Sequence, residues 1–195
     1  MLNRENAIQS LNNNQFNELG DKVFCKKIKE LPFVKKINLR LDPNDKDCVS
    51  SCSEILGTML PAKANTYSAN AINKKVIWLG PDEWLIVSDD DDAFIKLQNK
   101  IGNLEASVTD VSENRTIIRI RGKKTYVLLS KFLVLDLEKN LSTDLSCAQT
   151  LFVKVPVLLV RNHYDEIPEI DIFTNRSHAN YIYNLIVDGT KNLDF

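Results

Sequence analysis

The fold of this chain can be read most directly from residues 76–87, VIWLGPDEWLIV. Two apolar runs, 76–79 and 84–87, flank the turn sequence GPDE at 80–83. Glycine, proline and aspartate between two apolar runs favour a tight turn, so this stretch predicts an antiparallel hairpin. A hairpin in the middle of the chain argues against an all-parallel sheet and favours mixed or antiparallel sheets.

Apolar periodicity predicts further elements on either side of the hairpin. Alternating Ile37, Leu39 and Leu41 indicate a strand, and Pro61 ends a helix that begins near Asp47. The predicted elements of the first half are a strand over 34–41, a helix over about 47–59, a polar loop over 61–74, the hairpin, a helix after 92, and a strand over 108–111. Their order is β-α-β-β-α-β.

The second half predicts approximately β-α-β-β-β-α. Gly122 is expected to open a helix, Pro156 to separate two strands, Ser177 to cap the last helix and Gly189 to end it. The predicted strands cover 116–121, 149–155, 157–161 and 169–174. The sequence therefore predicts an α+β protein of two ferredoxin-like β-α-β-β-α-β-type layers that share a core, with mixed or antiparallel sheets.

With 195 residues, the chain is long enough to bury a core without a disulfide or metal. We expect a polar N-terminal arm over residues 1–20 that is either loose or ordered by a partner. A single domain over 21–195 is expected to follow, with sub-layers of about 34–111 and 112–189.

The net charge of −1 hides an uneven distribution. Residues 1–41 have a local charge of +4, which leaves −5 for the rest. A basic segment on an acidic body indicates either docking on an acidic partner or a solvated helix face. The near-neutral total does not favour a nucleic-acid partner. No signal peptide and no run of about 18 apolar residues is found in the sequence, so we expect a cytoplasmic protein without a membrane partner.

The cysteines fit a reducing compartment as free thiols. They are Cys25, Cys48, Cys52 and Cys147. Cys48 and Cys52 are four residues apart on one helix face, which suits either half of a metal site or small apolar residues lining a core. The second interpretation is favoured, because neither His163 nor His178 forms a spaced motif with them.

Motifs of a self-sufficient catalytic site are absent from the sequence. There is no G-x-G-x-x-G, P-loop, G-x-S-x-G or H-E-x-x-H. The acidic run 89–92 either binds a divalent cation or caps the helix that follows, and the helical spacing of Ala93, Leu97 and Ile101 favours the cap. We therefore expect no catalytic, cofactor-binding or metal-binding residues on this chain, which indicates a non-catalytic partner of other proteins.

Four motifs are distinctive in their order and spacing. They are WLGPDEWLIV (78–87), VTDVSENRT (108–116), CAQT (147–150) and RSHANY (176–181). Together with LRLDP at 39–43, they resemble the gamma subunit family of heterotetrameric sarcosine oxidase over about residues 34–189. The chain departs from the family pattern at Lys123, where proline is common, at His178, and at Tyr183, where tryptophan is frequent.

The resemblance implies a fold similar to the folate-binding region of the glycine-cleavage aminomethyltransferase. It also implies membership of a complex that oxidatively demethylates sarcosine to glycine, with hydrogen peroxide and formaldehyde or 5,10-methylene-tetrahydrofolate as the other products. In the family, FAD is on the beta subunit, FMN lies at the alpha–beta interface, NAD and tetrahydrofolate bind alpha, and zinc binds delta. The gamma subunit carries no known cofactor, so the implied role is a non-catalytic partner of alpha, beta and delta.

Several motif residues are candidates for an interface. They are Trp78, Gly80, Pro81, Asp82, Glu83, Trp84, Asp110, Ser112, Arg115, Gln149, Arg176 and Ser177. Trp78 and Trp84 suit either an interface anchor or a core. Arg115 suits a pair with Asp110 or a contact with a partner, and Arg176 is similar; a structural salt bridge is favoured for both arginines.

Two other functions remain open. A stand-alone folate-binding protein of one-carbon or iron–sulfur metabolism would have a similar fold. An unrelated ferredoxin-like interaction module would share the element order alone.

Overall fold

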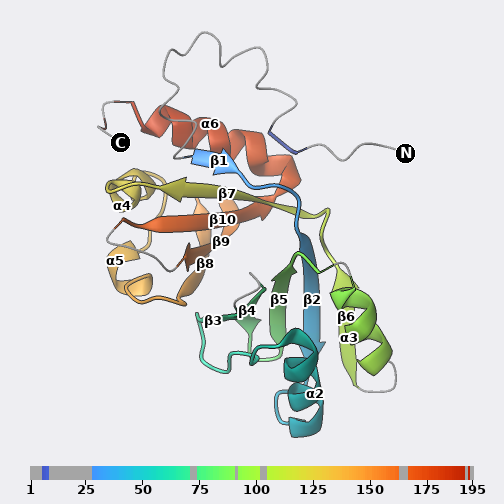
Figure 1. Ribbon diagram of the computed structural model, residues 1–195. Coiled ribbons are helices and arrows are strands. Elements are labelled where there is room, and N and C mark those ends of the chain that lie inside the picture. Colours follow the sequence, from blue (N-terminus) through green and yellow to red (C-terminus); the bar gives the residue numbers. More distant parts are fainter. Residues whose placement is uncertain are drawn as a thin grey trace. The chain divides into compact units, whose positions relative to one another are not determined.

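Two five-stranded antiparallel sheets organise the chain (Figure 1). The computed structural model describes residues 6–8, 28–70, 74–90, 92–101, 105–162, 167–191 and 193. The chain divides into unit 1, with Met1–Phe33, Glu113–Asp144 and Ala148–Phe195, and unit 2, with Val34–Ser112 and Leu145–Cys147. None of the helices in the described ranges has the length and apolar character needed to span a membrane.

Unit 2 contains the hairpin predicted from residues 76–87. Its strands run in the order β3 (Tyr67–Ala69), β4 (Lys75–Gly80), β5 (Glu83–Ser88), β2 (Lys35–Leu41) and β6 (Ala106–Asp110), each antiparallel to its neighbours. The order β4-β5-β2-β6 is that of the predicted ferredoxin-like layer. The edge strand β3 lies in the segment predicted as a polar loop, and at three residues it is too short to produce a period-2 pattern.

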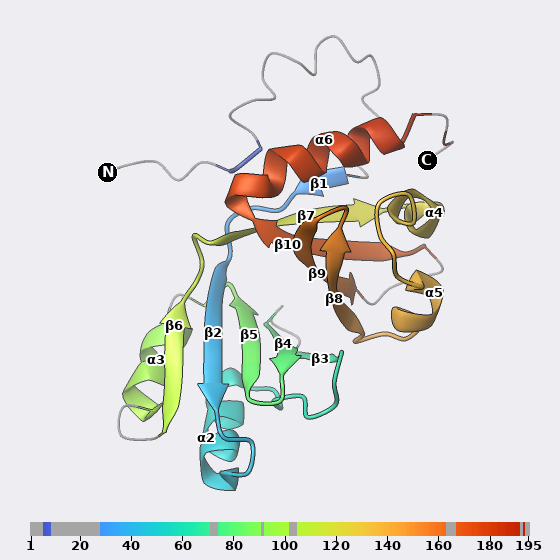
Figure 2. The same cartoon turned by 180° about the vertical axis from the view of Figure 1, so that it is seen from behind.

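Helices α2 (Lys46–Leu56) and α3 (Ala93–Ile101) lie on one face of this sheet, in front of it in Figure 1 and behind it in Figure 2. Their apolar sides and those of β2, β4 and β5 form one core. Asp45 caps α2 by accepting the Cys48 N–H at 3.0 Å. The helix ends short of the predicted residue 59, because Gly57 adopts a left-handed φ of 65°.

The strands of unit 1 run in the order β1 (Ile28–Glu30), β7 (Arg115–Arg121), β10 (Glu169–Asn175), β9 (Val155–Asn162) and β8 (Cys147–Phe152). Helices α4 (Thr125–Leu129) and α5 (Leu137–Asn140) precede β8, and η2 (Arg176–His178) and α6 (Ala179–Gly189) follow β10. From β7 onward this is the predicted β-α-β-β-β-α order, whereas no strand is predicted for the short β1, which lies in the basic segment. The strand order is not ferredoxin-like, because no helix separates β9 from β10 and each strand from β8 to β10 lies beside the next.

The core of unit 1 lies between its sheet and helices α4 and α6. The even-numbered residues of β7 and β10 face it, including Ile118, Ile120, Ile170 and Ile172. Residues 6–8 of the N-terminal arm also contribute, since Ile8 is buried in this core. The N–H groups of residues 7 and 8 donate to the Glu30 carboxylate at 3.0 and 2.8 Å.

The turn between β8 and β9 differs from the prediction. The chain turns at Val153 and Lys154, whereas Pro156 lies inside β9. Proline has no N–H for a ladder, but the part of β9 that pairs with β10 begins at Leu158, so Pro156 leaves that pairing intact. The conspicuous proline was therefore the wrong marker of the turn.

The ends of α6 also differ from the prediction. The turn Arg176–His178 precedes the helix, so its N-cap is His178 and not Ser177, and His178 makes no side-chain cap bond. Gly189 lies inside α6 and does not take the predicted C′ position. A Cβ at Gly189 would come within 2.7 Å of ring carbons of Phe132 and 2.9 Å of Leu128. Close packing, and not a left-handed conformation, explains this glycine.

Replacement of Gly189 with alanine should therefore destabilise the protein by about 1–3 kcal/mol, because the new methyl group overpacks the contact with Phe132. Urea unfolding followed by circular dichroism measures the change. Asn184→Ala, at an exposed position of the same helix, is the control and should change stability by no more than about 0.5 kcal/mol. A gain in stability on Gly189→Ala, as helix propensity alone would give, would contradict the packing argument.

Candidate functional site

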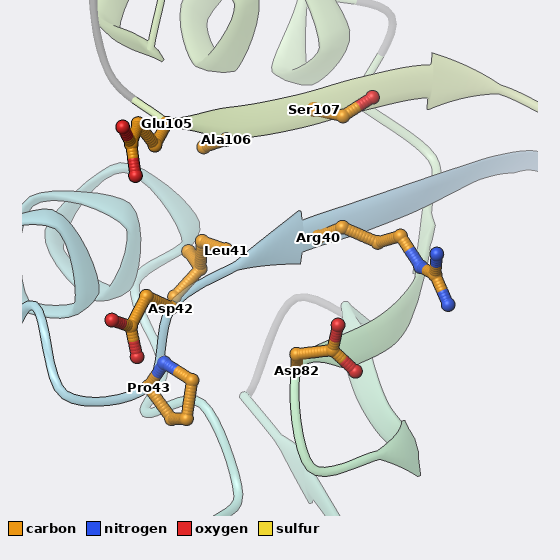
Figure 3. A pocket seen from close by; sticks show the side chains of 8 residues that line it. All are labelled: Arg40, Leu41, Asp42, Pro43, Asp82, Glu105, Ala106 and Ser107. Carbon is orange, nitrogen blue, oxygen red and sulfur yellow. The ribbon is translucent and has the colours of Figure 1, made fainter.

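Residues from LRLDP and from the WLGPDEWLIV motif line one open cleft in unit 2, with a volume of about 510 Å³ (Figure 3). Its lining comes from the end of β2, the β4–β5 turn and the start of β6. The lining residues are Arg40, Leu41, Asp42, Pro43, Asp82, Glu105, Ala106 and Ser107. The LRLDP and GPDE sequences, about 40 residues apart, therefore meet at one place.

Backbone pairing holds the cleft together. The Leu41 N–H donates to the Asp82 carbonyl at 3.2 Å, and Leu41 pairs with Ala106 of β6. The Asp42 carboxylate accepts the Asn44 N–H at 2.9 Å, which fixes the turn after β2. Figure 3 shows Asp42 and Glu105 on one side of the cleft and Arg40 and Asp82 on the other.

The cleft is acidic. Arg40 donates to Glu83 at 2.9 Å, and the Asn38 side-chain amide donates to the other oxygen of Glu83 at 2.7 Å. The carboxylates of Asp42, Asp82 and Glu105 are exposed around it. Within the described ranges, no group of three His, Cys, Asp or Glu side chains is arranged to hold a metal ion. An open acidic cleft of this kind suits contact with a polar or basic surface.

The two tryptophans of the hairpin have different environments. They pair directly across β4 and β5. Trp84 is 2% exposed, belongs to the unit 2 core, and donates its indole N–H to the Pro61 carbonyl at 2.9 Å. Trp78 is half-buried. The core interpretation therefore applies to Trp84, whereas Trp78 and the exposed Pro81 are accessible at the surface.

Ser112 has a structural role that involves a buried lysine. Its hydroxyl accepts the Lys36 N–H at 3.0 Å, and its own N–H donates to Asp110 at 2.9 Å. The Lys36 ammonium donates to the carbonyls of Val34 at 2.9 Å and Ser112 at 3.3 Å. Lys36 is only 2% exposed, so the predicted solvated face does not include it. These bonds tie the start of β2 to the residues that follow β6 within unit 2.

Replacement of Ser112 with alanine should lower the free energy of unfolding by about 1–3 kcal/mol, because it leaves the buried Lys36 N–H without its acceptor. Chemical denaturation monitored by tryptophan fluorescence reports on this unit, since Trp78 and Trp84 both belong to it. Ser107→Ala, at an exposed strand position, is the matched control. Equal stabilities for the two variants would contradict the role given to Ser112.

The remaining candidates of unit 1 come from three motifs. Arg115 pairs with Asn175 across β7 and β10. The Arg176 N–H donates to the Asn114 carbonyl at 3.0 Å, and its guanidinium lies 3.9 Å from Glu113. This joins the VTDVSENRT and RSHANY motifs and supports a structural pair for Arg176. Elsewhere in the unit, Ser177 and Gln149 are exposed, the second on the edge strand β8.

Sequence reasoning missed a buried ion pair in unit 1. Asp171 of β10 binds Arg119 of β7 through two bonds, 2.6 Å to Nε and 2.8 Å to Nη2. Glu169 lies 3.3 Å from the same guanidinium, and the Asn162 amide donates to Glu169 at 3.1 Å. The available signal was the matching alternation of the two strands, which puts Arg119 and Asp171 on the face opposite the apolar core.

The cysteines described by the structure are buried. Cys48 and Cys52 lie on the core-facing side of α2, and burial raises the pKa of both thiols, that of Cys52 to about 12. Burial likewise raises the pKa of Cys147 to about 12. These environments fit the core interpretation. Cys25 and His163 lie outside the described residues.

Asp90, in the acidic run before α3, accepts the Asp92 N–H at 2.9 Å. This bond is the main cause that lowers the pKa of Asp90, and Lys96 and Lys74 lower it further from 3.6 and 3.7 Å. The bond forms an Asx turn immediately before α3, and the capping role of the acidic run stays a prediction.

The native thiols should be nearly unreactive in a Cys25→Ser variant. At pH 8 a pKa of about 12 leaves only about one thiol in ten thousand as thiolate, and burial blocks access to the reagent. Ellman's reagent should therefore label Cys48, Cys52 and Cys147 only after denaturant is added. Rapid labelling of one of them in the native protein would contradict their assignment to the core.

Comparison with known protein families shows to which family the chain belongs. The model of the sarcosine oxidase, gamma subunit family matches residues 40–192. The chain belongs to the sarcosine oxidase gamma subunit family. The match includes the acidic cleft, the hairpin and the motifs of unit 1, so the resemblance seen in the sequence is confirmed.

Individual members of the family share about a quarter of their aligned residues with this chain. The sarcosine oxidase subunit gamma of Corynebacterium sp. (strain U-96) is 27% identical over 135 residues, which is 69% of this chain and 65% of the relative. That of strain P-1 is 27% identical over 136 residues, 69% of this chain and 66% of the relative. The chain thus spans just under two thirds of the length of the curated relatives it matches.

Solved structures share the fold. The heterotetrameric sarcosine oxidase from Corynebacterium sp. U-96 in complex with pyrrole 2-carboxylate contains a chain with a TM-score of 0.78 and 23% identity, covering 86% of this chain and 85% of that one. Aminomethyltransferase T of the glycine cleavage system from Bartonella henselae has a TM-score of 0.60 and 12% identity, covering 82% and 45%. The predicted α+β class and the likeness to the aminomethyltransferase are confirmed.

Proposed function

We propose that this chain is the gamma subunit of a heterotetrameric sarcosine oxidase and has a structural, non-catalytic role in it. The observation that carries the proposal is the family match over residues 40–192, which contains all four motifs in register. The complex would oxidatively demethylate sarcosine to glycine, with hydrogen peroxide and formaldehyde or 5,10-methylene-tetrahydrofolate as the other products. This is the oxidation of a CH–NH donor by oxygen.

The partners of the chain would be the alpha, beta and delta subunits. FAD, FMN, NAD, zinc and tetrahydrofolate would be held by these partners, in agreement with the lack of dinucleotide-binding motifs in this sequence. The complex would assemble in the cytoplasm, where the free thiols of Cys48, Cys52 and Cys147 remain reduced.

Under this proposal, the exposed motif residues contact other subunits. The accessible candidates are Asp82 at the acidic cleft, the exposed Pro81 next to it in the chain, the half-buried Trp78 and the exposed Gln149. Trp84 and Ser112 would support them from within unit 2, because both are buried and hydrogen-bonded.

Purification of the tagged chain from its own host tests the proposal. Three other subunits should co-purify with the tagged chain. The purified complex should show flavin absorbance near 450 nm and should form hydrogen peroxide when sarcosine is added. Recovery of the chain alone would contradict the proposal. Genes for flavoprotein subunits next to the gene of this chain would support it independently.

A stand-alone folate-binding protein is the second candidate, favoured by the fold likeness to aminomethyltransferase T. This function requires that the isolated chain bind tetrahydrofolate. Titration calorimetry distinguishes the two, since a structural gamma subunit should give no binding heat.

A further inference from the structure

Two exposed apolar side chains lie side by side at the edge of the unit 1 sheet. Leu133 and Phe152 form an antiparallel bridge. Residues next to a bridged pair are also neighbours, which places Val134 beside Leu151. Val134 is fully exposed and Leu151 is 53% exposed. Leu133 and Phe152 are buried in the unit 1 core, so Val134 and Leu151, one position along each segment, point to the opposite face of the sheet at its β8 edge.

Val153, two residues beyond Leu151, extends this edge at a strained position. Its φ is +57°, which is unfavourable for a β-branched residue, and glycine or asparagine would fit the turn better. Its N–H donates to the Phe132 carbonyl at 2.8 Å, so the turn is fixed. The side chain is 46% exposed and therefore adds little to the core. An exposed valine in a strained turn indicates that its side chain contacts another molecule.

Basic residues outnumber acidic ones in the part of the chain that carries these residues. Residues 115–162 contain nine Lys and Arg and three acids, Asp136, Glu138 and Asp144. Lys131 and Lys154, close to Val134 and Val153 in the chain, are exposed. We refer to Val134, Leu151 and Val153 as the apolar edge. A complementary surface would be apolar at its centre and would carry carboxylates around it.

We propose that the apolar edge docks on another subunit of the oxidase, at a surface whose apolar centre is bordered by Asp and Glu side chains. This inference rests on the proposed function. A second copy of the chain fits less well, because a two-fold contact through the same edge would bring Lys131 and Lys154 close to their own copies. Gln149, on the same strand, comes from a motif that resembles the gamma subunit family.

Co-expression of the tagged full chain with the other subunits tests the proposal. The double variant Leu151→Asp/Val153→Asp should reduce the flavin recovered per tagged chain by about tenfold or more. Ile95→Asp is the control, since Ile95 is 54% exposed on α3, and it should recover flavin like the wild type. Circular dichroism of the free chains should show that all variants fold.

Val153→Asn gives a second, independent measurement. Asparagine tolerates the left-handed conformation, so the melting temperature of the free chain should rise while flavin recovery falls. A merely structural role for Val153 would not produce these opposite changes.

The outcomes separate this proposal from the proposed function. Full flavin recovery by the double variant, when the wild type recovers flavin, overturns docking through the apolar edge and leaves the gamma subunit function intact. Failure of the wild type to recover flavin overturns both. A dimer of this chain that the double variant abolishes, with flavin recovery unchanged, also overturns the proposal in favour of a second copy.

Discussion

Replacement of Asp171 with alanine is expected to lower the free energy of unfolding by about 3–5 kcal/mol. The Asp171 carboxylate is almost fully buried and receives two parallel bonds from Arg119, at 2.6 and 2.8 Å. Bidentate, charge-assisted bonds of this length are strong, and they offset the cost of removing both charges from water. The alanine variant loses both bonds and leaves the partly buried guanidinium of Arg119 with less compensation.

Urea unfolding followed by far-UV circular dichroism measures this loss, because β7 and β10 belong to unit 1. Both tryptophans lie in unit 2, so fluorescence of the same samples shows whether the two units unfold together. Arg40→Ala breaks the exposed pair with Glu83 and is the control, with an expected loss of at most about 1 kcal/mol. A loss on Asp171→Ala no larger than this would contradict the role of the buried pair. Arg119→Met/Asp171→Leu should recover much of the stability, because it removes both charges together.

The parts of the fold that could be predicted are those with a local signal. The GPDE turn lies between two apolar runs, so the β4–β5 hairpin and its tryptophan pair follow from adjacent residues. Period-2 alternation located β2, β7 and β10 in the same way, because one face of each strand lines a core.

The missed features depend on residues far apart in the chain. Lys36 and Arg119 alternate with apolar residues along their strands, and charged side chains in such a pattern are normally exposed. Both are largely buried here, because Lys36 bonds to Ser112 and Arg119 bonds to Asp171, which are distant in the sequence. The β8–β9 turn uses Val153, which carries no turn signal, so the nearby Pro156 was misleading. The acidic cleft could be predicted only in part: its residues stand in recognisable motifs, but their meeting depends on the pairing of β2 with β6.

Replacement of Trp84 with alanine is expected to destabilise unit 2 by about 3–5 kcal/mol. The Trp84 side chain is 2% exposed and packs in the unit 2 core, which lies between the sheet and helices α2 and α3. The variant loses this packing and also the bond from the indole N–H to the Pro61 carbonyl. Trp84→Phe keeps most of the apolar contact and should recover more than half of the loss. Unfolding of these variants is followed by the fluorescence of Trp78, which remains in the same unit.

Trp78→Ala is the matched comparison, because the two tryptophans pair across one hairpin and differ mainly in burial. If Trp84 stabilises the core and Trp78 contacts a partner, Trp84→Ala should lower the unfolding midpoint of the free chain much more than Trp78→Ala. Trp78→Ala should instead reduce co-purification of the flavin-containing subunits while the free chain stays folded. Equal losses of stability would place both rings in the core, and an unchanged midpoint on Trp84→Ala would contradict the packing described for it. Directly paired residues share one face of the sheet, so the two tryptophans differ in exposure and not in the face they occupy, and this difference allows Trp84 to stabilise the core and Trp78 to contact a partner.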